Sequence, residues 1–563
     1  MKNILRTMAA LLPLVAASGC IRETMPEGSV QTKDQVAASE FALDGILRGL
    51  PASMLRYDTV GYDSNYDDHF DFGISAIHLA TEFMLNDLAT LGDNPAYNRY
   101  ALWNMNQAQD ARYVYCAYFW DCYYSWIKIA NDVISVIGQD ASTQEQQETL
   151  GKAYAYRAAL YLDLARLFEA KPVTDSYALA HSYRIPDGVV GLTVPIVRES
   201  TSENEAKHNA RAPREEMYAF ILSDLDKAEA LLQNSNFGYT QPGLAAVYGL
   251  RARARLEMGY WESGNDGAFE DAAKYAELAI TTSGKTPLTK SQWQDPENGF
   301  NNGASNSAWI WGQVLTAANQ RKFETFTAHI SSEATWGYAV LSKIGVDRKF
   351  YESIDDSDFR KASWLSPDYI GNTSDEKFRG MYSFAGSAEQ QKTFLSRVAV
   401  PYLSIKFRPA GGEVNDYNVG NCADHCLMRV EEMYFIEAEA KAHTDGVAAG
   451  KTLLESFVNK YRDPKFVCGA NSLEDFLKDD LLFQKRIEFW GEGLLIYDYK
   501  RLNSGIERGY AGTNQASIFR LNCTGRSPQW NVVITRGEFQ SNTAVNDETN
   551  NPDPSDKIEL WKE

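Results

Sequence analysis

The feature that most constrains the fold is a series of amphipathic segments that follow one another in pairs. Residues 115–138 place apolar side chains at helical spacing and end at Gly138, a residue type that commonly stops helices. A second such segment, 142–168, follows directly, and Ser142 with Glu145 matches a capping box at its start. Two adjacent helices of this kind predict a helical hairpin, the unit that stacks into tetratricopeptide-type arrays.

The same pattern returns twice further along the chain. Residues 213–282 contain three successive amphipathic segments whose small side chains suit close helix packing. Residues 429–462 contain two more, and 479–502 predict one further helix. The repeats are too degenerate to define a strict period. We therefore predict a mainly α fold built from tetratricopeptide-like helical pairs.

The amino terminus predicts a lipoprotein signal. Lys2 and Arg6 precede an apolar segment, 8–17, that is too short for a membrane span, which needs roughly 20 apolar residues. The sequence ASGC at 17–20 resembles a bacterial lipobox, in which the cysteine carries the lipid. We expect Cys20 to be lipidated and to anchor a soluble body to a membrane, and an ordinary secreted protein is the alternative.

Net charge and cysteine content limit the possible binding partners and the cellular compartment. The formal net charge is -20, which argues against nucleic acid as the main partner. Besides Cys20 there are six cysteines, and disulfides are permitted in a chain that leaves the cytoplasm. Cys422 and Cys426 form the most plausible local pair, although connectivity cannot be derived from the sequence.

Composition changes between the helical blocks. Residues 285–425 are rich in Gly, Asn, Ser and Pro with scattered Trp and Tyr. Insertions on a rigid scaffold usually carry function, so we predict that this region provides the ligand-binding face. The predicted regions are a signal peptide at 1–19, the lipidated cysteine and a tether at 20–40, an N-terminal region with helical pairs at 41–284, the loop-rich insertion at 285–425, and a C-terminal region with a helical repeat and a loop-rich tail at 426–563.

Motifs for nucleotide or metal binding are weak. The segment 446–452 is similar to a phosphate-binding loop, but it follows a helix and has one residue too few between its glycines. Cys422, His425 and Cys426 lack a fourth ligand for structural zinc. An EF-hand is rejected because Asp68 stands where Gly is required. A looser surface calcium site stays open at Asp63, Asp67, Asp68 and Asp71. We otherwise expect no cofactor.

Catalytic motifs are not found in the sequence either. It contains no nucleophile elbow, zinc-protease motif or dinucleotide fingerprint. Glu492, in the sequence WGEGLL, is interpreted as a structural residue of a scaffold turn rather than an acid catalyst. We predict that the chain is not an enzyme. A pair of carboxylates suited to glycoside hydrolysis, brought together by the fold, is the alternative that the sequence leaves open.

Aromatic residues are the strongest candidates for ligand contact. The chain contains 31 Tyr, 26 Phe and 12 Trp, and flat rings can stack on the C–H faces of sugars. Trp120, Trp126, Trp261 and Trp490 fall at helical spacing and are predicted to lie in the core. The candidates on loops are Trp103 with Asn104, Trp293, Trp336, Tyr338, Trp364 and Tyr369.

The order and spacing of several segments resemble one known family. After the lipobox come YYSWIKIANDVI at 123–134 and GKAYAYRAALYLDLARLF at 151–168. VPIV at 194–197, PREEMYAFILSDLDKAEALL at 213–232 and VYGLRARARLEMGYW at 247–261 follow, and the most specific are RVEEMYFIEAEA at 429–440 and QKRIEFWGEGLLIYDYKRL at 484–502. Together these segments resemble the SusD/RagB family of Bacteroidetes outer-membrane nutrient-binding lipoproteins.

This resemblance implies a helical scaffold that supports an irregular binding surface. It also implies a partner, a SusC-like TonB-dependent transporter in the outer membrane, to which the lipid-anchored protein delivers a captured glycan at the cell surface. Two alternatives remain, namely a tetratricopeptide-like scaffold that binds peptides or proteins and, less favoured, a surface glycosidase. The aromatic-rich segment 112–126 and the extra cysteines depart from the common family pattern and leave the cargo class open.

Overall fold

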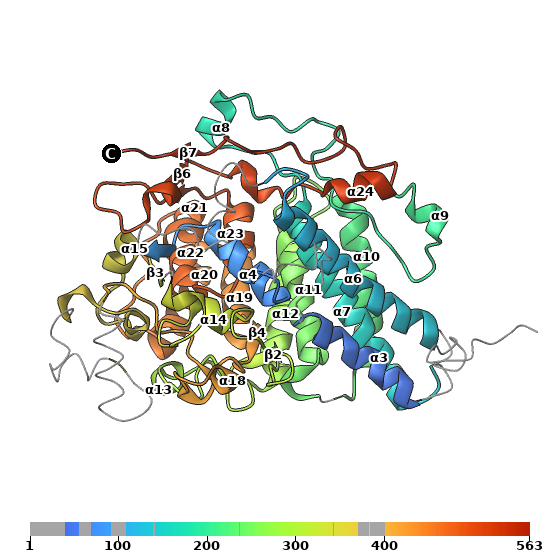
Figure 1. Cartoon of the computed structure of the whole chain (residues 1–563), viewed down its shortest axis with the longest axis horizontal. Helices are drawn as coiled ribbons and strands as arrows, with labels where there is room; N and C mark the ends of the chain where they lie inside the picture. The colour runs from blue at the N-terminus through green and yellow to red at the C-terminus, as the bar shows by residue number, and fades with distance from the viewer. Residues whose placement is uncertain are drawn as a thin grey trace, which may run out of the picture.

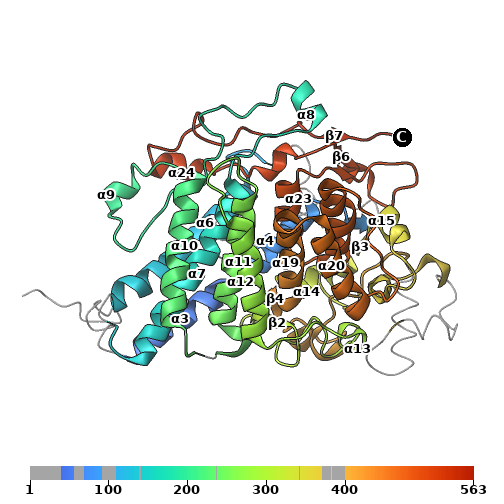
Figure 2. The same ribbon diagram turned by 180° about the vertical axis from the view of Figure 1, so that it is seen from behind.

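The computed structural model describes residues 40–55, 69–91, 109–138, 141–235, 237–341, 343–369, 382 and 400–563. Its scaffold is a row of long helices in which each packs against the next: α6 on α7, α7 on α10, α10 on α11, α11 on α12, α12 on α19 and α19 on α20. Figures 1 and 2 show α11 and α12 in the middle of this row, with α6, α7 and α10 on one side and α19 and α20 on the other. The predicted helical pairs are therefore present.

The helices of the scaffold are α3 (Glu40–Ser53), α4 (Ile74–Phe83), α6 (Val114–Ile137), α7 (Gln144–Phe168), α10 (Arg214–Leu231), α11 (Leu244–Gly259), α12 (Ala268–Ser283), α19 (Val430–Thr444), α20 (Val447–Tyr461), α22 (Leu482–Phe489) and α23 (Leu495–Leu502). Shorter helices are α8 (Ser176–Ala180), α9 (Glu203–Ala206), α13 (Lys290–Trp293), α14 (Phe326–Ile330), α15 (Arg348–Ser353), α18 (Tyr417–Gly420), α21 (Leu473–Asp475) and α24 (Arg536–Ser541). A π-helical turn, Phe476–Leu481, joins α21 to α22.

The strands that the structure describes are short. They are β1 (Leu88–Leu91), β2 (Trp309–Gln313), β3 (Lys343–Val346), β4 (His425–Arg429), β5 (Ile506–Glu507), β6 (Leu521–Cys523) and β7 (Glu559–Leu560). β1 pairs with β3 and β2 with β4, both antiparallel, so each pair joins the loop-rich region to a distant part of the chain. β5, β6 and β7 form a third small antiparallel sheet.

A buried arginine ties the first three helices of the row together. Arg157 on α7 donates Nε to Asp224 Oδ2 at 2.7 Å and Nη2 to Asp224 Oδ1 at 2.9 Å, across the contact with α10. Its Nη1 donates to Asn131 Oδ1 on α6 at 2.7 Å. Because a buried guanidinium must keep its partners, these bonds fix how α6, α7 and α10 sit on one another.

Two details of the helices differ from the sequence prediction. The capping box of α7 is formed by Thr143 and Gln146, one residue later than expected, because Thr143 accepts the N–H of Gln146. The expected single helix over 479–502 is wrong at its centre. Gly491 and Gly493 have φ of 78° and 76°, values that favour glycine and end α22 before α23 begins.

Burial confirms the core assignments of the helical tryptophans. Trp120, Trp126, Trp261 and Trp490 are all buried.

The proposed Cys422–Cys426 pair is wrong, because both residues are free thiols in the structure. Among the described residues, no helix is both long and apolar enough to cross a membrane.

Candidate functional site

The loop tryptophans that we expected at the binding surface are buried. Trp293, Trp336 and Trp364 are exposed by only 4%, 4% and 0%, so the expectation that their rings face a ligand is wrong. Trp293 Nε1 donates to Ser363 Oγ at 2.9 Å, and Trp364 packs edge-on against Trp490. Loops in this region fold over their own rings, which therefore support the surface from inside.

Several predicted residues fall outside the described part of the chain. Trp103 and Asn104 lie outside the described residues, as does the side chain of Tyr369. The same holds for Asp63, Asp67 and Asp68 of the open calcium site, whereas the remaining member, Asp71, is buried. Within the described ranges, no group of three or more Cys, His, Asp or Glu side chains is placed to hold a metal ion.

Tyr338 belongs to a group of partly exposed rings. We call His69, Phe323 and Tyr338 the ring cluster. The His69 and Phe323 rings stack with centroids 5.1 Å apart and planes 10° apart, and Tyr338 meets both edge-on at 5.6 and 5.7 Å. The His69 side chain is 32% exposed, and Phe323 and Tyr338 are half-buried. The cluster joins residues that are more than 250 positions apart in the sequence.

A buried histidine supports the ring cluster from behind. His329, on α14, stacks on Tyr338 with centroids 4.8 Å apart and on Phe72 at the same distance. Its Nε2 donates to the backbone oxygen of His69 at 3.0 Å, which links α14 to the start of the segment before α4. Burial lowers the pKa of His329 to about 4, so the ring is neutral at neutral pH.

One asparagine fastens the loops around the ring cluster. Asn421 is fully buried, and its Oδ1 accepts from Trp336 Nε1 and from Thr325 Oγ1, each at 2.8 Å. Its Nδ2 donates to the backbone oxygen of Arg321 at 3.0 Å. The segment that carries Phe323 is thereby joined to Trp336 and to the end of α18.

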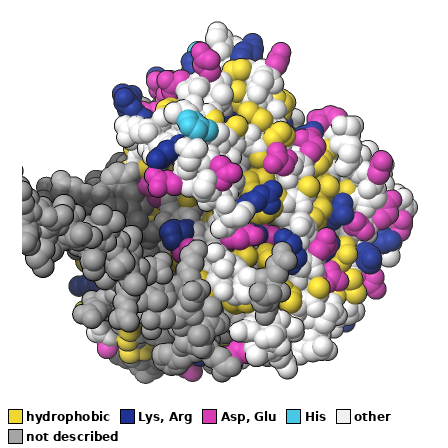
Figure 3. Space-filling view, turned by 90° about the vertical axis from the view of Figure 1, so that its right-hand side faces the viewer, with side chains coloured by type: hydrophobic (Ala, Val, Ile, Leu, Met, Phe, Trp, Pro, Cys, Tyr) yellow, Lys and Arg dark blue, Asp and Glu magenta, His cyan; other side chains and the backbone are white. Residues whose placement is uncertain are grey.

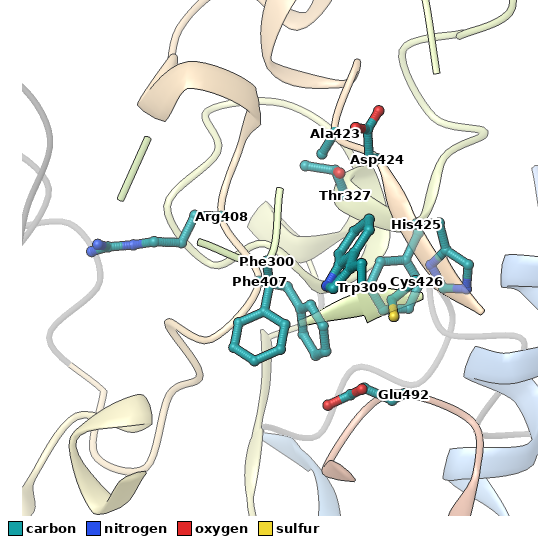
Figure 4. A pocket seen from close by; sticks show the side chains of 11 residues that line it. Phe300, Trp309, Thr327, Phe407, Arg408, Ala423, Asp424, His425, Cys426 and Glu492 are labelled. Carbon is teal, nitrogen blue, oxygen red and sulfur yellow. The ribbon is translucent and has the colours of Figure 1, made fainter. Parts of the chain in front are cut away.

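Behind these loops lies a small internal cavity of about 20 Å³, enough space for about one water molecule. Figure 4 shows aromatic rings, including Phe300, Trp309 and Phe407, on one part of its wall and the Glu492 carboxylate on another. His425 also lines it, and the His425 Nε2 atom is 2.9 Å from His78 Nδ1. Burial lowers the pKa of His78 to about 3 and that of His425 well below its usual value, so both rings are neutral.

The cavity borders a network of buried charges. Glu492 accepts from Lys406 Nζ at 2.7 Å and from Arg429 Nε at 2.8 Å, and Arg429 Nη1 donates to Glu488 at 2.7 Å. Arg360 and Arg462 also bind Glu488. The expectation that Glu492 is structural is therefore confirmed, since its carboxylate is fully engaged with buried cations that join β4 to the turn after α22.

The chemistry that the ring cluster offers is stacking. Three rings present partial apolar faces at the surface, and Lys322, which is exposed, lies 5.6 Å from the centre of the Phe323 ring and 5.7 Å from that of Tyr417. Flat rings beside hydrogen-bonding groups suit a ligand that has both C–H faces and hydroxyls. Sequence reasoning missed His69, Phe323 and Tyr417, although Phe323, set between Lys322 and Glu324, is an apolar residue in a charged loop and could have been noted.

Comparison with known proteins places the chain in a family. Residues 75–256 match a family model described as starch-binding and associating with the outer membrane, and residues 281–559 match the model of the SusD family. The chain belongs to the SusD family. This confirms the resemblance seen in the motifs, and with it the mainly helical fold. SusD family proteins are non-catalytic, carbohydrate-binding proteins associated with the outer membrane. Membership of this family confirms the prediction that the chain is not an enzyme.

Individual SusD relatives are distant in sequence. SusD-like protein P2 from Formosa agariphila is 25% identical over 448 residues, which cover 76% of this chain and 79% of that protein. A SusD-like carbohydrate binding protein from Bacteroides vulgatus matches with a TM-score of 0.67 at 20% identity, over 91% of this chain and 98% of that one. Surface glycan-binding protein A from Bacteroides thetaiotaomicron, in complex with laminarihexaose, has a TM-score of 0.60 at 15% identity, over 90% and 98%.

Proposed function

We propose that this SusD family protein binds an oligosaccharide or polysaccharide and that the ring cluster is part of the binding site. The observation that carries the proposal is the set of partly exposed rings of His69, Phe323 and Tyr338, of which Phe323 and Tyr338 lie in the predicted binding region, 285–425. Supporting it, a structural relative is in complex with laminarihexaose. Trp103, Asn104 and Tyr369 are further proposed contacts, which lie in or beside the chain segments that the structure does not describe.

We further propose that the protein is anchored in the outer membrane through a lipid on Cys20 and faces the cell surface. There it would pass its glycan to a SusC-like TonB-dependent transporter. The lipobox at 17–20 and the family description support this arrangement. Labelled lipid should be incorporated into the wild type and not into Cys20→Ala, and label in the variant would contradict the anchor. Pull-down from outer membranes should recover a TonB-dependent barrel, and its absence would contradict the partner.

The binding site is tested by removing its rings. Affinity electrophoresis and calorimetry over a panel of polysaccharides, with laminarihexaose among them, identify the ligand of the wild type. Phe323→Ala and Tyr338→Ala should each weaken binding, roughly fivefold for a stacking contact worth about 1 kcal/mol. Tyr177→Ala is the matched control, because Tyr177 stacks on His181 at 3.9 Å on α8, far from α14 in Figure 1.

Other outcomes of this experiment separate the alternatives. Unchanged affinity in both ring variants, with the fold intact by circular dichroism, would contradict the proposed site. Release of reducing ends during incubation would favour a glycosidase. Retention of peptides with no affinity for any polysaccharide would favour the peptide-binding scaffold.

A further inference from the structure

A large open groove lies on the scaffold, away from the ring cluster. Its volume is about 950 Å³, and its walls come from α6, from the segment 195–197, from the region of α9 and from α24. Figures 1 and 2 place α9 and α24 on the other side of the central helices α11 and α12 from α13 and α14. A volume of this size is typical of sites for small organic ligands.

One face of α6 forms the floor of the groove. Trp120, Asp121 and Tyr124 line it, with Ser125 and Lys128 further along the same helix. The rings of Trp120 and Tyr124 lie with centroids 4.7 Å apart. Both are held from outside the helix, because Trp120 Nε1 donates to Glu538 Oε2 at 3.3 Å and the Tyr124 hydroxyl donates to the Pro195 backbone oxygen at 2.6 Å. The rings are therefore fixed in place before any ligand arrives.

Two carboxylates that line the groove, one on α6 and one on α24, have no cationic partner among the described residues. Among the residues that the structure describes, no Lys, Arg or His forms an ion pair with Asp121 or Glu538. Within the described part of the chain, Glu538 accepts only from neutral donors, Trp120 Nε1 and, at 2.8 Å, Asn542 Nδ2. The two lysines at the groove are already paired, Lys128 with Asp132 at 2.6 Å and Lys207 with Glu203 at 2.7 Å.

Burial makes the charged forms of these two carboxylates unfavourable when no cation is nearby. Burial raises the pKa of Asp121 to about 6, with Glu538 adding to the effect, and burial likewise raises the pKa of Glu538. A ligand that brings a positive charge between them removes this penalty. A metal ion is disfavoured, since no set of three ligating side chains gathers within the described residues.

The remaining lining groups suit a polyhydroxylated ligand. Asn209, Gln540, Ser541 and Thr543 carry amide and hydroxyl groups that can bond hydroxyls, and the half-buried Tyr124, packed on the buried Trp120, offers an apolar surface. Figure 3 looks onto this side of the molecule and shows acidic and basic side chains among hydrophobic ones. We propose that this groove is a second binding site, which takes a saccharide with a free amino group whose ammonium lies between Asp121 and Glu538.

Matched glucosamine oligomers test the proposal. Calorimetry compares the β-1,4-linked glucosamine tetramer, at a pH where its amines are protonated, with its N-acetylated counterpart. The full chain should bind the amine form and not the acetylated one. Asp121→Asn and Glu538→Gln should each weaken binding about tenfold or more, because each removes a charge-assisted hydrogen bond. The Gln side chain retains an oxygen for Trp120 Nε1 but cannot also accept from Asn542 Nδ2, so Asp121→Asn is the cleaner of the two variants.

The control lies on another helix of the scaffold. Glu216→Gln removes an equal charge from α10 at an exposed residue that does not line the groove, so it reports general attraction between a cationic sugar and an acidic protein. Unchanged affinity in Glu216→Gln with loss in Asp121→Asn supports the proposal. Equal loss in both variants, equal affinity for the acetylated tetramer, or no binding by the wild type overturns it. Binding of neutral glycans at the ring cluster is measured separately and does not depend on this result.

Discussion

Mild acid should remove the stability that the buried histidines contribute to this protein. His78 has a pKa lowered to about 3 and His329 one lowered to about 4, both chiefly by burial. In the unfolded chain each ring has a pKa of about 6.5, so the unfolded state binds more protons once the pH falls below that value. A depressed folded-state pKa therefore gives stability that is complete above about pH 6.5 and is lost as the pH falls toward the folded value.

The magnitude follows from the size of the shift. Between about pH 7 and about pH 5, a histidine that stays neutral when folded costs about 2 kcal/mol of unfolding free energy, close to 1.4 kcal/mol per pH unit below its unfolded pKa. His78 and His329 together should cost about 4 kcal/mol. Glu82 acts in the opposite direction over the same interval. Burial raises its pKa to about 8, so its contribution is complete below its unfolded pKa and is lost as the pH rises toward about 8, which offsets about 2–3 kcal/mol of the histidine effect between about pH 7 and about pH 5. The net change in the wild type is therefore smaller than the histidine term, which has to be measured as a difference between variants.

Urea unfolding of matched variants isolates the histidine contribution. His78→Asn removes the titrating ring and keeps a polar side chain beside His425, so its loss of stability between about pH 7 and about pH 5 should be smaller than that of the wild type by about 2 kcal/mol. His181→Asn is the control, since His181 is exposed. If the wild type and His78→Asn lose the same free energy on acidification, the neutral buried pair is not what makes the fold sensitive to acid.

Two further perturbations address the scaffold. Glu488→Gln should lower the unfolding free energy by about 3–5 kcal/mol, because it leaves the buried guanidinium groups of three arginines without their shared carboxylate, and an unchanged urea midpoint would contradict this. Gly493→Ala should destabilise more than Gly138→Ala, since both have positive φ but only at Gly493 would the new Cβ meet the His78 Cβ, at 2.4 Å. Equal melting temperatures for the two glycine variants would refute that difference.

The sequence predicts the scaffold well because helix periodicity is local. The apolar spacing in 115–138 and 142–168 requires only neighbours three or four positions away, and the structure places α6 and α7 there. Errors arise where the backbone conformation, rather than the side-chain pattern, determines where a helix ends. The apolar spacing continues through Gly491 and Gly493, whose positive φ values end one helix before the next begins.

The binding surface could not be predicted in the same way, because its geometry depends on distant contacts. A ring on a loop was expected to be exposed, yet Trp336 is buried because Asn421, 85 positions away, accepts its N–H. Phe323 is only half-buried; that same asparagine holds the backbone nearby at Arg321, and the Phe323 ring stacks on His69. Which ring is covered is decided by loop-to-loop hydrogen bonds, so composition alone cannot separate a supporting tryptophan from a contacting phenylalanine.

The same reasoning applies to the groove on α6, where helical spacing correctly assigned Trp120 to the core. That assignment is incomplete, because a residue can be buried by its neighbours and still line a groove. Trp120 bonds through its Nε1 to Glu538 on α24, more than 400 positions later in the chain, and this bond holds Glu538 in the groove that Asp121 also lines. The helix face with Trp, Asp, Tyr and Ser at positions 120, 121, 124 and 125 can be recognised as a groove wall only once the segment that packs beside it is known. The scaffold therefore contributes binding chemistry of its own, in addition to holding the loops that carry the ring cluster.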